Sequence, residues 1–243
     1  MTQLFAVDVS HHQGAMDWKR TKAAGVQFAF IKATEGLNWY DPQFSANVSG
    51  AREYEIPFGI YHYWRGLVAP ELQLANIMKS YEAIEIGDTI PIAIDVESHD
   101  GPTPTQTRDM LAKFVQLLID ETGKLPTIYT SKERWDRYVA KYDRWEELPL
   151  WVANWDTSEP VLPRDWNNWF IWQYKVESNG YKYGAEQGKQ IDVDYVKPAY
   201  LEFYGIGQSQ PVPEPTPQPQ PTMLEVITEI VINGIIYRGE MKR

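Results

Sequence analysis

The chain of 243 residues has a net charge of −10, no cysteine, and 43% hydrophobic and 23% charged residues. The length suits one large domain with a small appendage, and the lack of cysteine excludes disulfide scaffolds, zinc–thiolate sites and cysteine catalysis. The acidic balance argues against nucleic-acid binding. No apolar run approaches the roughly 18 residues of a bilayer-spanning helix, so no membrane insertion is expected.

Short β-branched or aromatic runs alternate with helical patterns over the first 142 residues. Asp17 is expected to cap the first helix at its N-terminus, and Gly123 to cap the fourth at its C-terminus. The predicted strand–helix pairs are 5–10 with 17–24, 28–33 with 42–54, 58–63 with 70–86, 90–97 with 105–122, and 127–130 with 131–142. Three further strands, 150–154, 169–174 and 191–196, follow without long helices.

Five strand–helix units followed by three strands predict an α/β protein. Repeated units of this kind imply parallel strands joined by right-handed crossovers. Eight strands can close a TIM-like barrel, although the last three would lack helical cover. A doubly wound open sheet is the competing fold.

The composition changes near residue 208. Residues 208–222, QSQPVPEPTPQPQPT, alternate Pro with small or polar residues, which predicts an extended, semi-rigid linker. It separates a body, 1–207, from a tail, 223–243. In the tail, Asn233-Gly234 between apolar runs predicts a β-hairpin. Because a lone hairpin is marginal in water, we expect the tail to self-associate or to dock on another surface such as the cell wall; the alternative is a disordered remnant.

The stretch 92–97, IAIDVE, carries the strongest chemical signal. Side chains alternate across a strand, so Asp95 and Glu97 share one face with Ala93, opposite an aliphatic face. In a βα barrel that face points inward at the strand's carboxyl end, where barrel active sites form. Neighbouring carboxylates raise one another's pKa, so one can stay protonated beside a charged partner. Glycoside hydrolysis needs this arrangement.

Two other strands place acids in the same way. Asp8 lies on the inward face of the first strand, and Asp192 on that of the last, which would neighbour the first in a closed barrel. Asp8, Asp95, Glu97 and Asp192 are therefore expected to converge at one end. An exposed strand end that merely turns polar is the alternative for each acid alone.

Aromatic residues gather at the same strand ends. Tyr61, Tyr63, Trp151 and Trp172 are among them, and aromatic faces with a polar rim suit flat, weakly amphipathic ligands such as sugar rings. His11 and His12 follow the first strand, but no metal-binding spacing accompanies them, so no metal is expected. Serine-hydrolase and phosphate-binding motifs are absent.

Seven motifs in order, spanning about residues 4–204, resemble the family 25 glycoside hydrolases, the Chalaropsis-type lysozymes. They are FAVDVSHHQG (5–14), FIKATEG (30–36), GIYHY (59–63), DVE (95–97), LWVANW (150–155), IWQY (171–174) and IDVD (191–194).

The resemblance implies a flattened barrel of five βα units and three strands. It also implies cleavage of the β-1,4 bond between N-acetylmuramic acid and N-acetylglucosamine in peptidoglycan, without metal or cofactor. Carried over by motif, Glu97 is the expected general acid, and Asp95 the partner that polarises the substrate's 2-acetamido group or stabilises the oxocarbenium-like centre. Asp8 and Asp192 would be supporting carboxylates, and the expected substrate-binding residues are Tyr61, Tyr63, Glu35, Trp151 and Trp172.

The lack of a visible signal peptide, the lack of cysteine, and the linker with a small tail resemble a phage endolysin. Such an enzyme would stay in the cytoplasm of a Gram-positive host until a holin releases it to the wall. A bacterial autolysin is the second interpretation. An inactive glycan-binding barrel and a structural phage tail component are weaker interpretations of the same sequence. A deacetylase or amidase would need a metal constellation that the sequence lacks.

Overall fold

The computed structural model describes residues 3–84, 90–98, 100–101, 103–206, 227–232 and 235–240. The chain divides into two compact units, Met1–Gly207 and Gln208–Arg243, and each is described by itself. The predicted linker, 208–222, and the Asn233-Gly234 turn lie outside the described residues.

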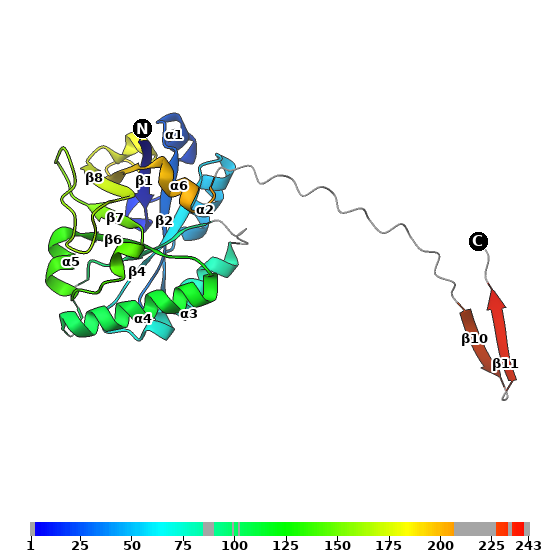
Figure 1. Ribbon diagram of the computed structural model, residues 1–243. Helices are drawn as coiled ribbons and strands as arrows, with labels where there is room; N and C mark the ends of the chain where they lie inside the picture. The colour runs from blue at the N-terminus through cyan, green and yellow to red at the C-terminus, as the bar shows by residue number, and fades with distance from the viewer. Residues whose placement is uncertain are drawn as a thin grey trace. The chain divides into compact units, whose positions relative to one another are not determined.

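Eight strands of the first unit close into a barrel, which confirms the barrel prediction over the open doubly wound sheet (Figure 1). A short strand, β3 (Trp39–Tyr40), pairs with β2 outside the barrel. In order around the barrel, the strands are β1 (Leu4–Val9), β2 (Phe28–Glu35), β4 (Phe58–Tyr63), β5 (Ile92–Asp95), β6 (Thr127–Ser131), β7 (Leu150–Ala153), β8 (Ile171–Glu177) and β9 (Ile191–Val196).

Helices follow the first five barrel strands, as predicted, and α3 lies beside α4 (Figure 1). The Asp17 side chain caps α1 by accepting from the Arg20 backbone N–H, and Gly123 ends α4 in the left-handed conformation, at φ 69°. The helices are α1 (Trp18–Ala23), α2 (Phe44–Glu53), α3 (Pro70–Ala83), α4 (Pro104–Thr122), α5 (Lys132–Tyr138) and, unforeseen from the sequence, α6 (Pro198–Phe203). The described ranges also contain three 3₁₀ helices, at His11–Gln13, Trp145–Glu147 and Gly180–Tyr183. Among the described residues, no helix is long and apolar enough to cross a membrane.

Strand β9 runs antiparallel to both of its neighbours, β1 and β8, whereas the other neighbouring barrel strands are parallel. This direction decides where its acids lie. Asp192 comes early in β9, and the antiparallel register sets it opposite Asp8, near the carboxyl end of β1. A parallel β9 would have placed Asp192 toward the opposite end of the barrel.

Apolar side chains pack on both faces of the barrel sheet, in an outer layer and an inner cluster. Ile92, Ile94 and Val96 belong to the outer layer under the helices, while Ala93 belongs to the inner cluster, which is the alternation expected of a strand. The inner cluster includes Tyr200 and Tyr204 from the α6 region.

The hydroxyls of these two tyrosines anchor α6 at the amino end of β6. The Tyr200 hydroxyl lies 2.8 Å from Thr127 Oγ1, and the Tyr204 hydroxyl donates to the Leu125 carbonyl at 2.7 Å. Because α6 covers that end, the polar interior of the barrel is reached from the carboxyl ends of the parallel strands.

The second unit contains a two-stranded antiparallel sheet of β10 (Ile227–Ile232) and β11 (Ile235–Glu240). Its pairing runs from Ile227 opposite Glu240 to Ile232 opposite Ile235.

Candidate active site

Strand β5 delivers the central carboxylate pair. The strand ends at Asp95, which is 6% exposed, and Glu97 follows two residues later, only partly buried. Asp95 therefore lies deeper in the barrel, and Glu97 lies nearer to solvent. Among the described residues, Asp95 Oδ1 has no hydrogen-bond partner. A buried carboxylate oxygen without a donor favours a protonated group or a ligand that supplies one.

The four predicted acids converge in one cavity of about 250 Å³ at the carboxyl end of the barrel. Asp8 is 8% exposed, and Asp192 lies opposite it on the neighbouring strand. Tyr61, Tyr63 and Trp151 also line this cavity. Trp151 forms part of its floor, since its ring stacks on the buried Phe30 at 4.3 Å between centroids.

Burial and crowding raise the pKa values of all four acids. Burial raises the pKa of Asp95 well above its ordinary value, and the neighbouring Glu97 adds to that effect. Burial also raises the pKa of Glu97, against the opposing charges of Arg134 and Lys32. The pKa of Asp8 rises through burial and then through Asp192, and that of Asp192 rises to about 6 through burial and Glu97. The acids of the cavity therefore hold their protons to a higher pH than exposed carboxyls do, which favours acid catalysis.

Asp194 is a further buried acid one layer below the cavity. Its Oδ1 accepts the Trp151 indole N–H at 2.7 Å, and the acids Asp8 and Asp192 lie close to it. The bond to Asp194 fixes the orientation of the Trp151 ring. Burial, the largest effect, raises the pKa of Asp194 to about 8.

This shift predicts a pH-dependent stability. An Asp in an unfolded chain ionises near ~3.9, so between about pH 4 and pH 8 the folded state holds a proton that the unfolded state has released, and the free energy of unfolding falls as pH rises. We expect Asp194→Asn to raise the melting temperature at pH 8 and to change it little at pH 4.5. Thermal denaturation at both pH values tests this; an equal difference at the two would contradict it.

Gln173, which the sequence interpretation did not single out, joins several of these groups. Its Nε2 donates to Asp8 Oδ2 at 2.8 Å. Its Oε1 accepts from the Tyr129 hydroxyl at 3.0 Å and from the Trp155 indole N–H at 2.9 Å. Two donors at Oε1 fix the amide orientation, so Nε2 must face Asp8. The alternation of β8 could have identified it, because Gln173 shares the inward face with Ile171.

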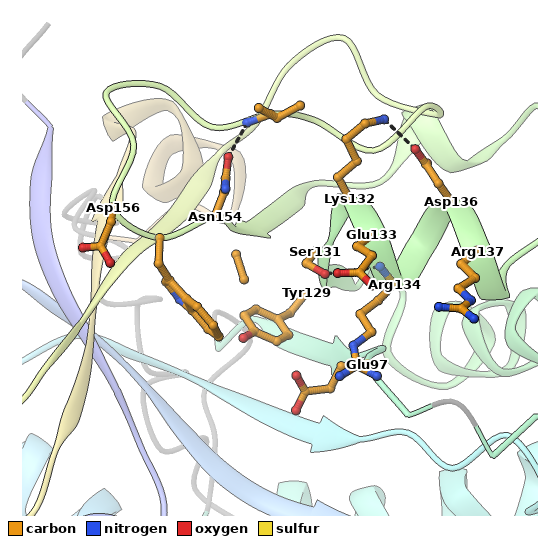
Figure 2. Close-up of a pocket in the computed structure, with 13 residues that line it drawn as sticks. Glu97, Tyr129, Ser131, Lys132, Glu133, Arg134, Asp136, Arg137, Asn154 and Asp156 are labelled. Carbon is orange, nitrogen blue, oxygen red and sulfur yellow. Dashed lines mark hydrogen bonds and ion pairs between the residues drawn. The ribbon is translucent and has the colours of Figure 1, made fainter.

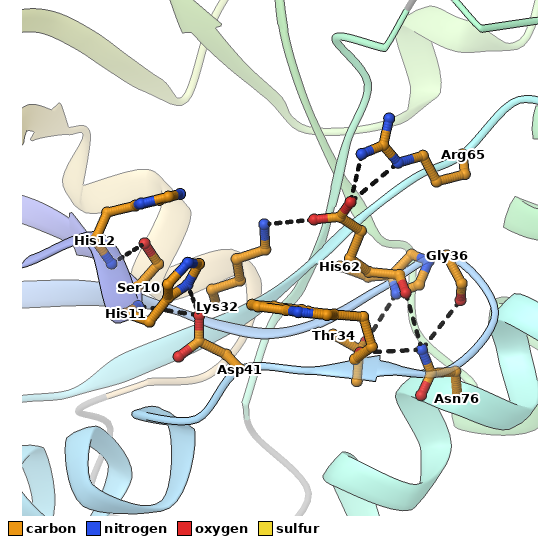
Figure 3. A network of polar contacts seen from close by, with 12 residues as sticks. Ser10, His11, His12, Lys32, Thr34, Gly36, Asp41, His62, Arg65 and Asn76 are labelled. Atoms are coloured by element: carbon orange, nitrogen blue, oxygen red, sulfur yellow. Dashed lines mark hydrogen bonds and ion pairs between the residues drawn. The ribbon is translucent and has the colours of Figure 1, made fainter.

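Glu35 forms ion pairs with Lys32 and Arg65, and Figure 3 shows these two cations. Lys32, 6% exposed, lines the cavity and bonds Glu35 Oε2 at 2.9 Å. Arg65 bonds the other carboxylate oxygen, with its Nε at 3.0 Å. These cations outweigh the effect of burial and lower the pKa of Glu35. Glu35 does not itself line the cavity, but its ion pair holds Lys32 in place there. The predicted contact of Glu35 with substrate stays a prediction.

His11 has a buried acidic partner. Its Nδ1 lies 2.8 Å from Asp41 Oδ2, and its backbone N–H donates to the same oxygen at 3.0 Å (Figure 3). Asp41 is fully buried, so this contact fixes the loop after β1. Within the described ranges, no group of three or more His, Asp or Glu residues could hold a metal ion.

A match to a family model identifies the protein family of this chain. The model described as glycosyl hydrolases family 25 matches residues 7–184. The chain belongs to glycosyl hydrolases family 25.

Relatives within this family include lysozymes and muramidases. Lysozyme M1 of Streptomyces globisporus is 33% identical over 201 residues, which cover 77% of this chain and 65% of the relative. The N,O-diacetylmuramidase of Chalaropsis sp. is 29% identical over 194 residues, covering 73% of this chain and 89% of the relative. Among solved structures, the lysozyme of Streptomyces coelicolor superposes with a TM-score of 0.72 at 26% identity, covering 85% of this chain and 97% of that one.

Trp172, which the sequence interpretation placed among the substrate-binding residues of this family 25 protein, does not line the cavity. Trp172 belongs to the outer apolar layer, is 5% exposed, and its indole N–H donates to the Asn154 carbonyl at 2.8 Å. Strand alternation explains the difference, since Ile171 and Gln173 face inward and Trp172 between them faces out. The tryptophan near the site that faces solvent is Trp155, which is 50% exposed.

The positions of Trp155 and Trp172 predict different effects of their substitution on KM. We expect Trp155→Ala to raise KM for cell-wall glycan about fivefold, because an aromatic platform contributes about 1 kcal/mol. Trp172→Phe should leave KM unchanged, with any effect confined to stability. Steady-state kinetics check this prediction, with melting temperatures as the control. A raised KM for Trp172→Phe would show that Trp172 binds substrate, as the sequence interpretation expected.

A second, larger cavity of about 890 Å³ adjoins the first, and the two share Glu97 and Tyr129 as wall residues. The larger cavity lies between α5 and the segment that follows β7 (Figure 2). Figure 2 shows Arg134 of α5 extending toward Glu97. Glu97 therefore stands where the deep acidic cavity meets a wider, open one.

Proposed function

We propose that this protein is a peptidoglycan hydrolase, an N-acetylmuramidase that cleaves the β-1,4 bond between N-acetylmuramic acid and N-acetylglucosamine. The observation that carries the proposal is the Asp95–Glu97 pair, one acid deep and one nearer to solvent, at the mouth of a family 25 barrel. The names of the relatives, lysozyme and N,O-diacetylmuramidase, support the choice of bond.

Glu97 is the proposed general acid. It is partly buried, borders both cavities, and has a raised pKa, so it can hold the proton that the leaving oxygen needs. Arg134 and Lys32 favour release of that proton, because both lower the pKa of Glu97 against burial.

Asp95 is the proposed partner of the substrate's 2-acetamido group. Its Oδ1 lacks a donor among the described residues, and an acetamido N–H would supply one. That hydrogen bond would stabilise ionised Asp95 and leave the proton of the pair on Glu97. Ionised Asp95 could then polarise the acetamido group or stabilise the oxocarbenium-like centre directly.

Two assays on purified Gram-positive peptidoglycan test the reaction class. We expect the protein to release reducing sugar ends without releasing free amino groups. Free amino groups without reducing ends would indicate an amidase or peptidase. Binding without either product would indicate an inactive glycan-binding barrel, against which the intact Asp95–Glu97 pair argues.

We further propose a phage endolysin, held in the host cytoplasm until a holin opens the membrane. The small sheet unit after a Pro-rich segment supports this proposal, with an autolysin as the alternative. Expressed in a Gram-positive cytoplasm, the protein should lyse the cells only after the membrane is permeabilised. Lysis without permeabilisation would favour the autolysin.

We also propose that the hairpin unit, residues 223–243, binds the wall or self-associates. The molar mass of the whole chain, compared with that of a version ending at Gly207, tests this. Equal monomers would exclude self-association, and equal affinity of the two for walls would exclude wall binding.

A further inference from the structure

The larger cavity differs from the deep one in its chemistry. Charged side chains of both signs line it, whereas acids dominate the deep cavity. The lining charges are Glu97, Lys132, Glu133, Arg134, Asp136, Arg137 and Asp156. A neutral glycan needs hydrogen bonds and aromatic faces, which Asn154 and Trp155 can supply here. The surrounding charges point to a ligand that is itself charged.

Among the described residues, Arg137 and Asp156 do not take part in the ion pairs of the larger cavity. Lys132 is paired with Asp136 at 2.5 Å. In the described part of the chain, Arg137 lies over the Tyr138 ring at 5.3 Å and is in ion-pair contact with no carboxylate, and Asp156 forms no ion pair. Figure 2 shows Asp156 on one side of the cavity and Arg137 on the other.

The backbone at Asp156 supports a role in binding. Its φ of 56° lies in the left-handed region, which is uncommon for a residue other than glycine and recurs at ligand sites. The Asp156 N–H donates to the Tyr174 carbonyl at 3.1 Å and holds this conformation. The exposed Trp155 precedes it, so one fixed turn presents both side chains at the cavity.

We propose that the larger cavity binds the peptide stem that muramic acid carries in peptidoglycan. This inference rests on the proposed muramidase function. Such a stem is a short peptide with free carboxylates and, where its side-chain amine is not cross-linked, a cation. Arg137 binds a stem carboxylate, and Asp156 binds the stem amine. Because this cavity shares Glu97 with the deep one, a sugar at the acid can extend its peptide into it.

Soluble glycan oligomers that carry or lack peptide stems provide the test. We expect wild type to show a kcat/KM at least about tenfold higher on the stem-bearing oligomer, the gain of two charge pairs. Arg137→Gln and Asp156→Asn should each lower kcat/KM about fivefold on that oligomer and leave the stem-free one unchanged. Asparagine also tolerates the left-handed conformation, so Asp156→Asn keeps the turn.

Arg144→Gln is the matched control, because Arg144 is exposed, paired with Glu147 and outside both cavities. It should cleave both oligomers as wild type does. Equal wild-type activity on the two oligomers, or equal losses in the variants on both, would overturn the peptide site while leaving the muramidase intact. If wild type cleaves neither oligomer, the proposed function itself fails.

Discussion

Glu97→Gln should lower kcat on peptidoglycan by about 10²–10⁴-fold, the range that general acid catalysis contributes. Glutamine keeps the shape and can still donate a hydrogen bond, but it cannot transfer a proton to the leaving oxygen. Burial holds the pKa of Glu97 above its ordinary value, so wild type should lose activity as pH rises through that pKa and the carboxyl ionises. Initial rates across a pH series measure both effects.

The control for Glu97→Gln is Glu147→Gln. Glu147 is exposed, paired with Arg144 and outside both cavities. It should keep wild-type kcat. If Glu97→Gln retained more than about a tenth of the wild-type kcat, a loss well below the range expected of a general acid, Glu97 would not be that acid.

Asp95→Asn should lower kcat by a comparable factor of about 10²–10³, because preorganised charge next to a developing cation is among the largest catalytic effects. The substitution is nearly isosteric at a site that is 6% exposed, and an amide in place of a carboxylate of raised pKa should not destabilise the fold. We therefore expect an unchanged or higher melting temperature beside the lost activity.

A substrate that lacks the 2-acetamido group distinguishes the two roles proposed for Asp95. If Asp95 acts through the 2-acetamido group, wild type should cleave de-N-acetylated glycan poorly, and Asp95→Asn should add little further loss. A full additional loss on that substrate would show that Asp95 acts on the oxocarbenium-like centre directly.

The fold could largely be predicted because the βα units carry local signals. Aliphatic and inward residues alternate plainly in 92–97, and both Asp17 and Gly123 cap helices as predicted. The direction of β9 could not be predicted, since its loop connections fit either direction. The short helix α6 was missed because its tyrosines are buried inside the barrel rather than along an amphipathic face.

The acids of the site were predicted to converge, and the structure places them in one cavity. Trp172 was assigned from its residue type and strand position, without regard to which face of β8 it occupies. Counting alternate residues from Ile171 would have selected Gln173 instead. The larger cavity depends on how α5 lies beside the segment after β7, which no local pattern in the sequence specifies.

We propose that this barrel cleaves the bond that follows N-acetylmuramic acid, with Glu97 as the general acid. Purified Gram-positive peptidoglycan can be digested by wild type and by Glu97→Gln, and the new ends identified by borohydride reduction and mass spectrometry. We expect reduced muramic acid ends from wild type and none above background from Glu97→Gln. Reduced glucosamine ends, or equal muramic acid ends from both proteins, would contradict this assignment.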